Sequence, residues 1–136
     1  MNSPTPDQAR WAADSWNYVA MRFEERTRDE EGDFTPMLRL IDHICTSCEV
    51  DLLSAGTSLF YLVVASAAHV SSPNKLAHDA PAIGILQLDM GFEFRDANGN
   101  RCKVAFGQAS RVLDAQLVRL GMMVDEYDHR TSKQIR

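Results

Sequence analysis

The sequence predicts an α+β protein in which four helices accompany one antiparallel β-hairpin, placed between the third and fourth helices. Three features support this class: two proline-marked helix starts, a long apolar segment that contains an alanine-rich stretch, and an alternating run followed by an Asn-Gly turn. With 136 residues, 45% of them apolar, the chain has the length and composition of one domain. We expect this domain to span 1–136, with loose ends at about 1–4 and 130–136.

The first predicted helix begins at about Pro6, and the hydroxyl of Thr5 is expected to cap it. Pro6 suits the first helical position, and Gln8 completes a capping box. We expect the helix to run to about Glu30. Apolar residues at three- and four-residue steps form its buried stripe: Ala12, Trp16, Val19, Ala20 and Phe23.

A second helix is predicted to start with Thr35 as its cap and Pro36 at its first helical position. The residues at helical spacing along its apolar face are Leu38, Ile41, Ile44, Cys45, Cys48 and Leu52.

This helix contains a Cys-x-x-Cys pair two residues after His43, which raises the question of a metal or redox centre. At 100° per residue, Cys45 and Cys48 lie about 60° apart, whereas His43 points away from both. A reactive thiol favours a helix N-terminus, and zinc needs further ligands at recognisable spacing, which this chain lacks. We therefore predict core thiols, with no metal and no cofactor. The alternative is a small-molecule or metal-responsive protein that uses Cys45, Cys48 and Cys102.

The segment 57–72 is apolar on nearly every side and is predicted as the central, buried third helix. A strand over 59–64 is the competing prediction, but the alanine-rich stretch 65–68 favours a helix. His69 is expected to complement the negative end of that helix.

The strongest strand pattern runs over 86–94, where apolar residues alternate with polar ones. Parity excludes a two-residue Asn-Gly turn, and a three-residue loop at 97–99, with Gly99 left-handed in a bulge, restores apolar pairing. The predicted partners are Phe94 with Cys102, Phe92 with Val104, Met90 with Phe106, and Glu93 with Lys103. Cys102 then points into the core.

A last helix is predicted from about Ser110, fading at 128–132. Its apolar stripe consists of Leu113, Leu117, Leu120, Val124 and Tyr127.

Composition and charge exclude several functional classes. The longest apolar stretch, 59–68, is about half of the roughly 20 residues that a bilayer span requires, and no secretory signal precedes it. Three cysteines fit a reducing compartment, so we expect a soluble cytoplasmic protein without membrane contact. The net charge is −5, and no Lys/Arg cluster supports direct nucleic-acid binding. The acidic run 23–33 suits a basic partner or a solvated helix end.

No nucleophile elbow, phosphate-binding glycine loop or metalloprotease motif occurs, so we predict that the protein is not an enzyme. Two local groupings carry acid/base side chains: His78 with Asp79, and Glu126 with Asp128 and His129. A small enzyme that uses His78 or His129 is the alternative.

The first helix carries the best indication of a binding surface. Trp11 and Tyr18 lie on nearly the same bearing, away from the buried stripe, and Arg22 shares their face. Trp, Tyr and Arg dominate interface hot spots, although a neighbouring helix would explain both rings equally well. The predicted partner-binding set is Trp11, Tyr18, Arg22, Glu24, Glu25, Asp29 and Glu30.

We therefore expect a small acidic interaction module that binds and modulates a partner protein. Inhibitors, immunity proteins and adaptors of bacterial or phage systems are examples of the class. A symmetric homodimer, in which two hairpins pair into one sheet, is a further expectation.

Overall fold

The computed structural model describes residues 3–47 and 50–134, and within them it contains three α-helices, three 3-10 helices and two antiparallel sheets. The prediction of four helices with one hairpin is therefore wrong, although the α+β class holds. The helices are α1 Pro6–Arg28, α2 Thr35–Ser47, η1 Val50–Leu52, η2 Ala67–His69, η3 Phe106–Gln108 and α3 Ala109–Gln134. The strands are β1 Leu53–Ser58, β2 Tyr61–Ser66, β3 Val70–Ser72, β4 Lys75–Leu76, β5 Ala82–Gln87, β6 Gly91–Arg95 and β7 Arg101–Ala105.

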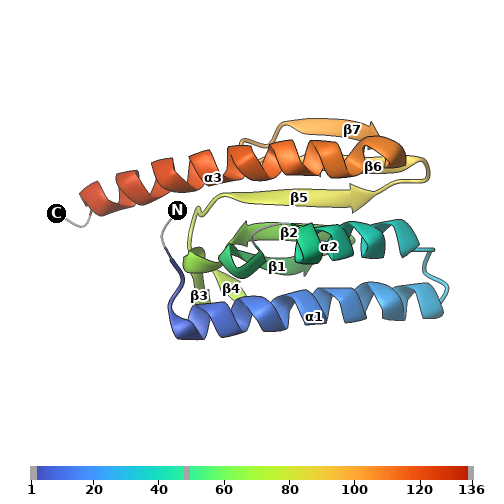
Figure 1. Ribbon diagram of the computed structural model, residues 1–136, viewed down its shortest axis with the longest axis horizontal. Coiled ribbons are helices and arrows are strands. Elements are labelled where there is room, and N and C mark those ends of the chain that lie inside the picture. Colours follow the sequence, from blue (N-terminus) through green and yellow to red (C-terminus); the bar gives the residue numbers. More distant parts are fainter. Residues whose placement is uncertain (1–2, 48–49, 135–136) are drawn as a thin grey trace.

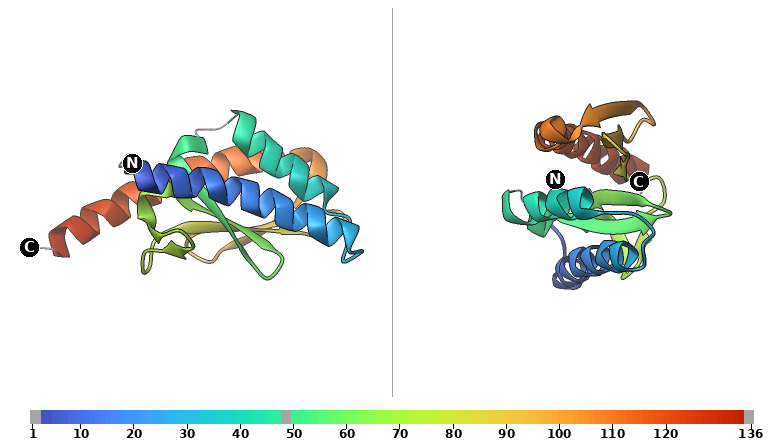
Figure 2. Two further views of the ribbon diagram at one scale, coloured as in Figure 1. Left: turned by 90° about the horizontal axis from the view of Figure 1, so that it is seen from below. Right: turned by 90° about the vertical axis from the view of Figure 1, so that its right-hand side faces the viewer.

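The main sheet is a five-stranded antiparallel meander in the order β1-β2-β5-β6-β7. The small β3–β4 hairpin is an excursion between β2 and β5. Helices α2 and α3 cover one face of the sheet, and α1 runs along its β1 edge (Figures 1 and 2). The opposite face carries no described helix. Among the described residues, no helix has both the length and the apolarity needed to cross a membrane.

The hydrophobic core lies between the sheet and the helices. Cross-strand partners of an antiparallel sheet share a face, and the helix-covered face carries seven buried apolar side chains. These are Leu53, Leu62, Val64, Ile83, Ile85, Phe92 and Phe94. They pack against buried residues of the helices, chiefly Val19, Phe23, Met37, Ile41, Ile44, Leu113, Leu120 and Val124.

The first helix confirms its predicted start and buried stripe. The Thr5 hydroxyl accepts from the Gln8 N–H at 3.1 Å, and the Gln8 side chain accepts from the Thr5 N–H at 2.9 Å. Ala12, Trp16, Val19 and Phe23 are buried, and Ala20 is half-buried.

The predicted central helix is wrong, because most of 57–72 forms strands. Tyr61–Ser66 is an inner strand with β1 on one side and β5 on the other: Leu62 and Val64 are buried against the helices, and Val63 is half-buried on the opposite face. The alanine-rich stretch becomes the end of β2 and the short η2 turn. His69 therefore ends η2, rather than a long helix.

The predicted 86–94 strand is also wrong, since a tight turn divides it into β5 and β6. The Leu88 N–H donates to the Gly91 carbonyl at 2.7 Å across this turn. Met90 is 82% exposed at the turn and does not pair with Phe106.

The other three predicted cross-strand pairs are confirmed. Phe94 pairs with Cys102, Phe92 with Val104 and Glu93 with Lys103. The loop at 97–99 lies between Asp96 and Asn100, and Gly99 has φ +86°.

The predicted burial of the cysteines is wrong for the two that the structure describes. Cys45 and Cys102 are both exposed, and Cys48 lies outside the described residues. Met37 and Leu40, which the predicted stripe of the second helix omitted, are buried instead.

The two edges of the main sheet differ. At β1, side chains of α1 bind the backbone: the Ala55 N–H donates to Ser15 Oγ at 2.9 Å, and the Trp16 indole N–H donates to the Leu53 carbonyl at 3.0 Å. Arg26 donates to the Leu59 carbonyl at 2.9 Å in the β1–β2 turn. At the other edge, every residue of β7 except the half-buried Val104 is exposed.

Candidate partner-binding groove

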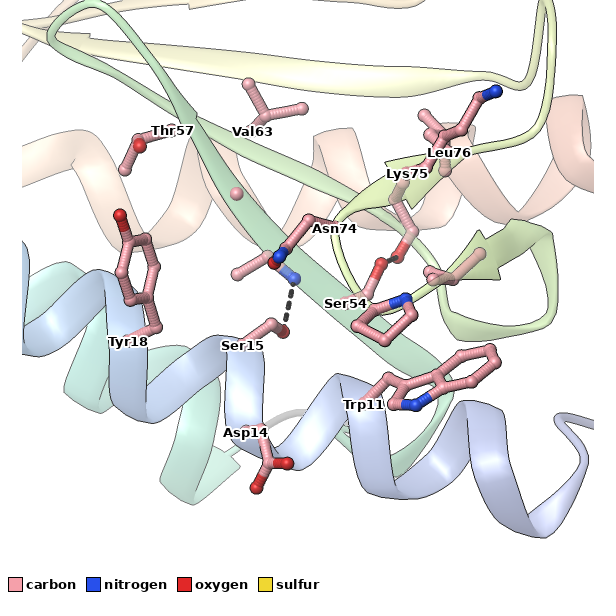
Figure 3. A pocket seen from close by; sticks show the side chains of 15 residues that line it. Trp11, Asp14, Ser15, Tyr18, Ser54, Thr57, Val63, Asn74, Lys75 and Leu76 are labelled. Atoms are coloured by element: carbon pink, nitrogen blue, oxygen red, sulfur yellow. Dashed lines mark hydrogen bonds between the residues drawn. The ribbon is translucent and has the colours of Figure 1, made fainter.

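A groove of about 580 Å³ lies between α1, the helix-free face of β1 and β2, and the β3–β4 hairpin. Figure 3 shows its side chains, with α1 along one side and the hairpin residues Asn74, Lys75 and Leu76 on the other. The groove therefore joins three segments that are far apart in the sequence.

Small side chains form the floor of the groove. Ser54 pairs with Ala65, and Gly56 pairs with Val63, all on the helix-free face of the sheet. A β-carbon built on Gly56 would meet no atom within 4 Å, so the floor is hollow at this position. Larger residues in the same strands would fill the space.

One flank of α1 forms the first wall, with Trp11, Ser15 and Tyr18 one turn apart. The bond between Ser15 Oγ and the Ala55 N–H, drawn dashed in Figure 3, fixes the helix against the floor strand. Trp11 is half-buried, and Tyr18 is 49% exposed and stands toward Thr57. The predicted Trp11–Tyr18 face is therefore the wall of a groove, and no described helix covers it.

The β3–β4 hairpin forms the second wall, with its turn at Pro73 and Asn74. Gln8 ties this wall to the start of α1, because its side-chain amide donates to the carbonyls of Ala68 and Val70, each at 3.0 Å. The second residue of the α1 capping box thus also positions the hairpin.

The charges along the groove are mixed. Asp14 lines the α1 side and Lys75 lies on the hairpin side. Further along α1, Arg22 pairs with Glu25 at 3.0 Å. Of the predicted partner-binding set, the groove lining contains Trp11 and Tyr18.

The remaining acidic members of the predicted set lie outside the groove. Glu24, Asp29 and Glu30 are exposed near the C-terminal end of α1, where Asp29 is the cap residue and Glu30 has φ +60°. With the exposed Glu31 they outnumber the exposed Arg28 at that end, so the surface there is net negative.

The described residues of the two alternative functions do not converge. Cys45 lies on α2 and Cys102 on β7, and the described residues contain no group of three metal-ligating side chains. His78 is 94% exposed beside Asp79 in a loop, and His129 is exposed on α3.

The structure also brings together a pair that the sequence did not indicate. His69 Nε2 lies 2.7 Å from Asp128 Oδ1, and the buried His69 ring packs edge-on against Tyr127, with centroids 4.8 Å apart. These residues are 59 positions apart, so no local pattern predicts them.

The groove floor was missed for a different reason. The floor residues Ser54, Gly56 and Ala65 belong to no recognisable functional motif. The prediction of a helix over 57–72 also concealed that they lie together on one face of two paired strands. Two sequence signals could have revealed them: a glycine inside a short strand, at Gly56, and the Pro73-Asn74 turn that follows the apolar segment. No family model matches the chain, and neither a curated protein nor a solved structure matches it significantly.

Proposed function

We propose that this protein is an interaction module that binds and modulates a partner protein by holding an extended segment of it in the groove. The observation that carries the proposal is the position of Trp11 and Tyr18 along a hollow floored by Ser54, Gly56 and Ala65. Aromatic side chains beside small ones create the deep contacts that dominate protein interfaces.

The shape of the groove favours a peptide segment over a small molecule. Small-molecule sites commonly bury 70–90% or more of their ligand. This groove is open along α1, and Tyr18 in its wall is half exposed. An extended chain would lie along the floor and place alternate side chains between Trp11 and Tyr18.

The acidic residues that follow the last turn of α1 favour a basic segment. Asp14 lines the groove, and the exposed carboxylates of Glu24, Asp29 and Glu30 lie at the C-terminal end of the same helix. A segment with Lys or Arg at that end would be attracted and oriented by these groups.

Site-specific photo-crosslinking tests the proposal. Tyr18 is replaced by benzoylphenylalanine in the cells from which the protein comes, and a second variant carries the probe at Val118, which is 67% exposed on α3. We expect a protein adduct at position 18 that is absent at 118, with the crosslink mapped to a basic segment.

Gly56→Val supplies the matched control. The β-carbon of the new side chain would meet no atom within 4 Å, and valine suits a strand, so the fold should be kept while the groove is filled. The adduct at position 18 should disappear in this variant. An adduct that survives, or the same adduct at 118, would contradict the proposal.

Alanine substitutions give the energetic counterpart. Trp11→Ala and Tyr18→Ala should each weaken binding of the crosslinked partner by about 2 kcal/mol, because both rings act as interface anchors. Unfolding in urea should change little, in contrast to Trp16→Ala, which removes a ring that is 5% exposed in the core. Unchanged affinity with collapsed stability would assign Trp11 and Tyr18 to the core.

A further inference from the structure

The second edge of the main sheet differs from the first in a way that indicates a binding surface. Ser15, Trp16 and Arg26 close the β1 edge, as described above. No described strand follows β7 in the sheet, and Figure 1 shows β7 at its margin. An unpaired edge strand presents a row of backbone donors and acceptors that can pair with another strand.

The side chains of β7 divide between two faces. Arg101 and Lys103 lie on the helix-free face, and Arg95 of β6 is directly opposite Arg101. No hydrogen bond or ion pair joins these three cationic side chains to another described residue. Like charges directly opposite on neighbouring strands destabilise a sheet, so this arrangement costs stability unless an anion lies nearby.

Intramolecular neutralisation of these cations is weak. Glu93 is opposite Lys103, but its carboxylate is nearly buried and accepts a hydrogen bond from the Tyr61 hydroxyl at 3.1 Å. The helix side of β7 is apolar, with Cys102 exposed and Val104 half-buried. Phe106, directly after the strand, is 36% exposed.

These charges disfavour a second copy of the chain as the occupant. If two β7 strands paired antiparallel with their helices on the same side, a centred register would place Lys103 opposite Lys103 or Arg101 of the other copy. The expected hairpin-to-hairpin homodimer is therefore disfavoured at this edge.

We propose that β7 accepts a strand from a partner protein, and that this strand alternates acidic with apolar residues. Its carboxylates would meet Arg95, Arg101 and Lys103 on the helix-free face, and its apolar side chains would cover Cys102, Val104 and Phe106. The added strand extends the sheet by backbone hydrogen bonds, and charge complementarity sets its identity. This surface is at the opposite edge from the groove, so the two sites are independent.

A short blocked peptide of alternating glutamate and valine is the probe, with a lysine–valine peptide for comparison. We expect the glutamate peptide to bind, with amide shifts and slowed hydrogen exchange in β7. The double variant Arg101→Glu/Lys103→Glu should weaken this binding at least about tenfold and should gain binding of the lysine peptide. The same charge change at Arg28 and Arg111, both exposed elsewhere, should leave binding unchanged.

N-methylation of alternate peptide bonds separates strand addition from simple ion pairing on the unaltered protein. It keeps every charge and removes the backbone donors, so we expect binding to be lost. Equal binding of the methylated peptide, amide shifts outside β7, or no binding by the glutamate peptide would each overturn the proposal.

Discussion

Asp33 shows how one carboxylate fixes the start of a helix. Its Oδ1 accepts from both the hydroxyl and the backbone N–H of Thr35, at 2.6 and 3.1 Å. These two bonds, first the one from the hydroxyl, lower the pKa of Asp33 below its ordinary value of 3.8. The sequence predicted a cap at Thr35, whereas the structure makes Asp33 the acceptor and Thr35 the first helical residue.

A pH dependence follows from this lowered pKa. A carboxylate whose folded pKa lies below its unfolded value stabilises the fold above the unfolded pKa, and this contribution is lost as the pH falls through the folded value. Asp33→Ala should therefore lower the free energy of unfolding at pH 7, and the difference from wild type should shrink at pH 3. Urea titrations at both pH values measure it, with the exposed Asp89→Ala as control. A difference that stays the same at pH 3 would contradict this.

Sequence patterns predicted single residues correctly where the interactions are between near neighbours in the chain. The Thr5–Gln8 capping box and the Gly99 bulge each depend on neighbours within a few positions, and both are confirmed. Burial of Cys45 and Cys102 depended on the position of whole elements, and that prediction is wrong. Trp11 and Tyr18 could be placed on the outer flank of α1, but the groove beside them needed strands that the sequence did not reveal.

At the scale of elements, the β6–β7 pair depends on close approach of two backbones at Gly91. A β-carbon there would collide with the Val104 carbonyl oxygen, which is a backbone atom and cannot rotate away. Gly91→Ala should therefore destabilise the protein by about 1–3 kcal/mol, as overpacking does.

Urea unfolding measures this cost, and Gly107→Ala is the matched control because its β-carbon would meet nothing. Equal stability of the two alanine variants would show that β7 shifts without penalty. In that case the β7 edge would also be more adaptable than its pairing with β6 suggests.

Helices and strands were predicted wrongly where the hydrophobic periodicity of the sequence did not distinguish them. An inner strand such as β2 is apolar on both faces, and a short apolar run of this kind resembles a buried helix. The turn between β5 and β6 was hidden because Leu86, Leu88 and Met90 continue an alternation that leads into Phe92. In the structure Leu86 lies on the helix-free face, opposite Glu93, so that alternation has no structural basis.

At the scale of the molecule, the α+β class could be predicted, because helix caps and strand alternation both left traces in the sequence. The balance between helix and sheet could not, since it depends on pairings such as Leu62 with Ile85 that join distant segments. The groove has the same origin, because it exists only after α1, β1 and the β3–β4 hairpin have assembled.

The closure of the β1 edge by α1 has a consequence for how the chain assembles. Its hydrogen bonds link residues 33, 37 and 40 positions apart, whereas the β1–β2 hairpin forms locally. Contacts of longer sequence separation form more slowly, so we expect α1 to dock after the hairpin. During synthesis α1 is made before β1. Until α1 docks, the edge of β1 is open to pairing with other nascent chains.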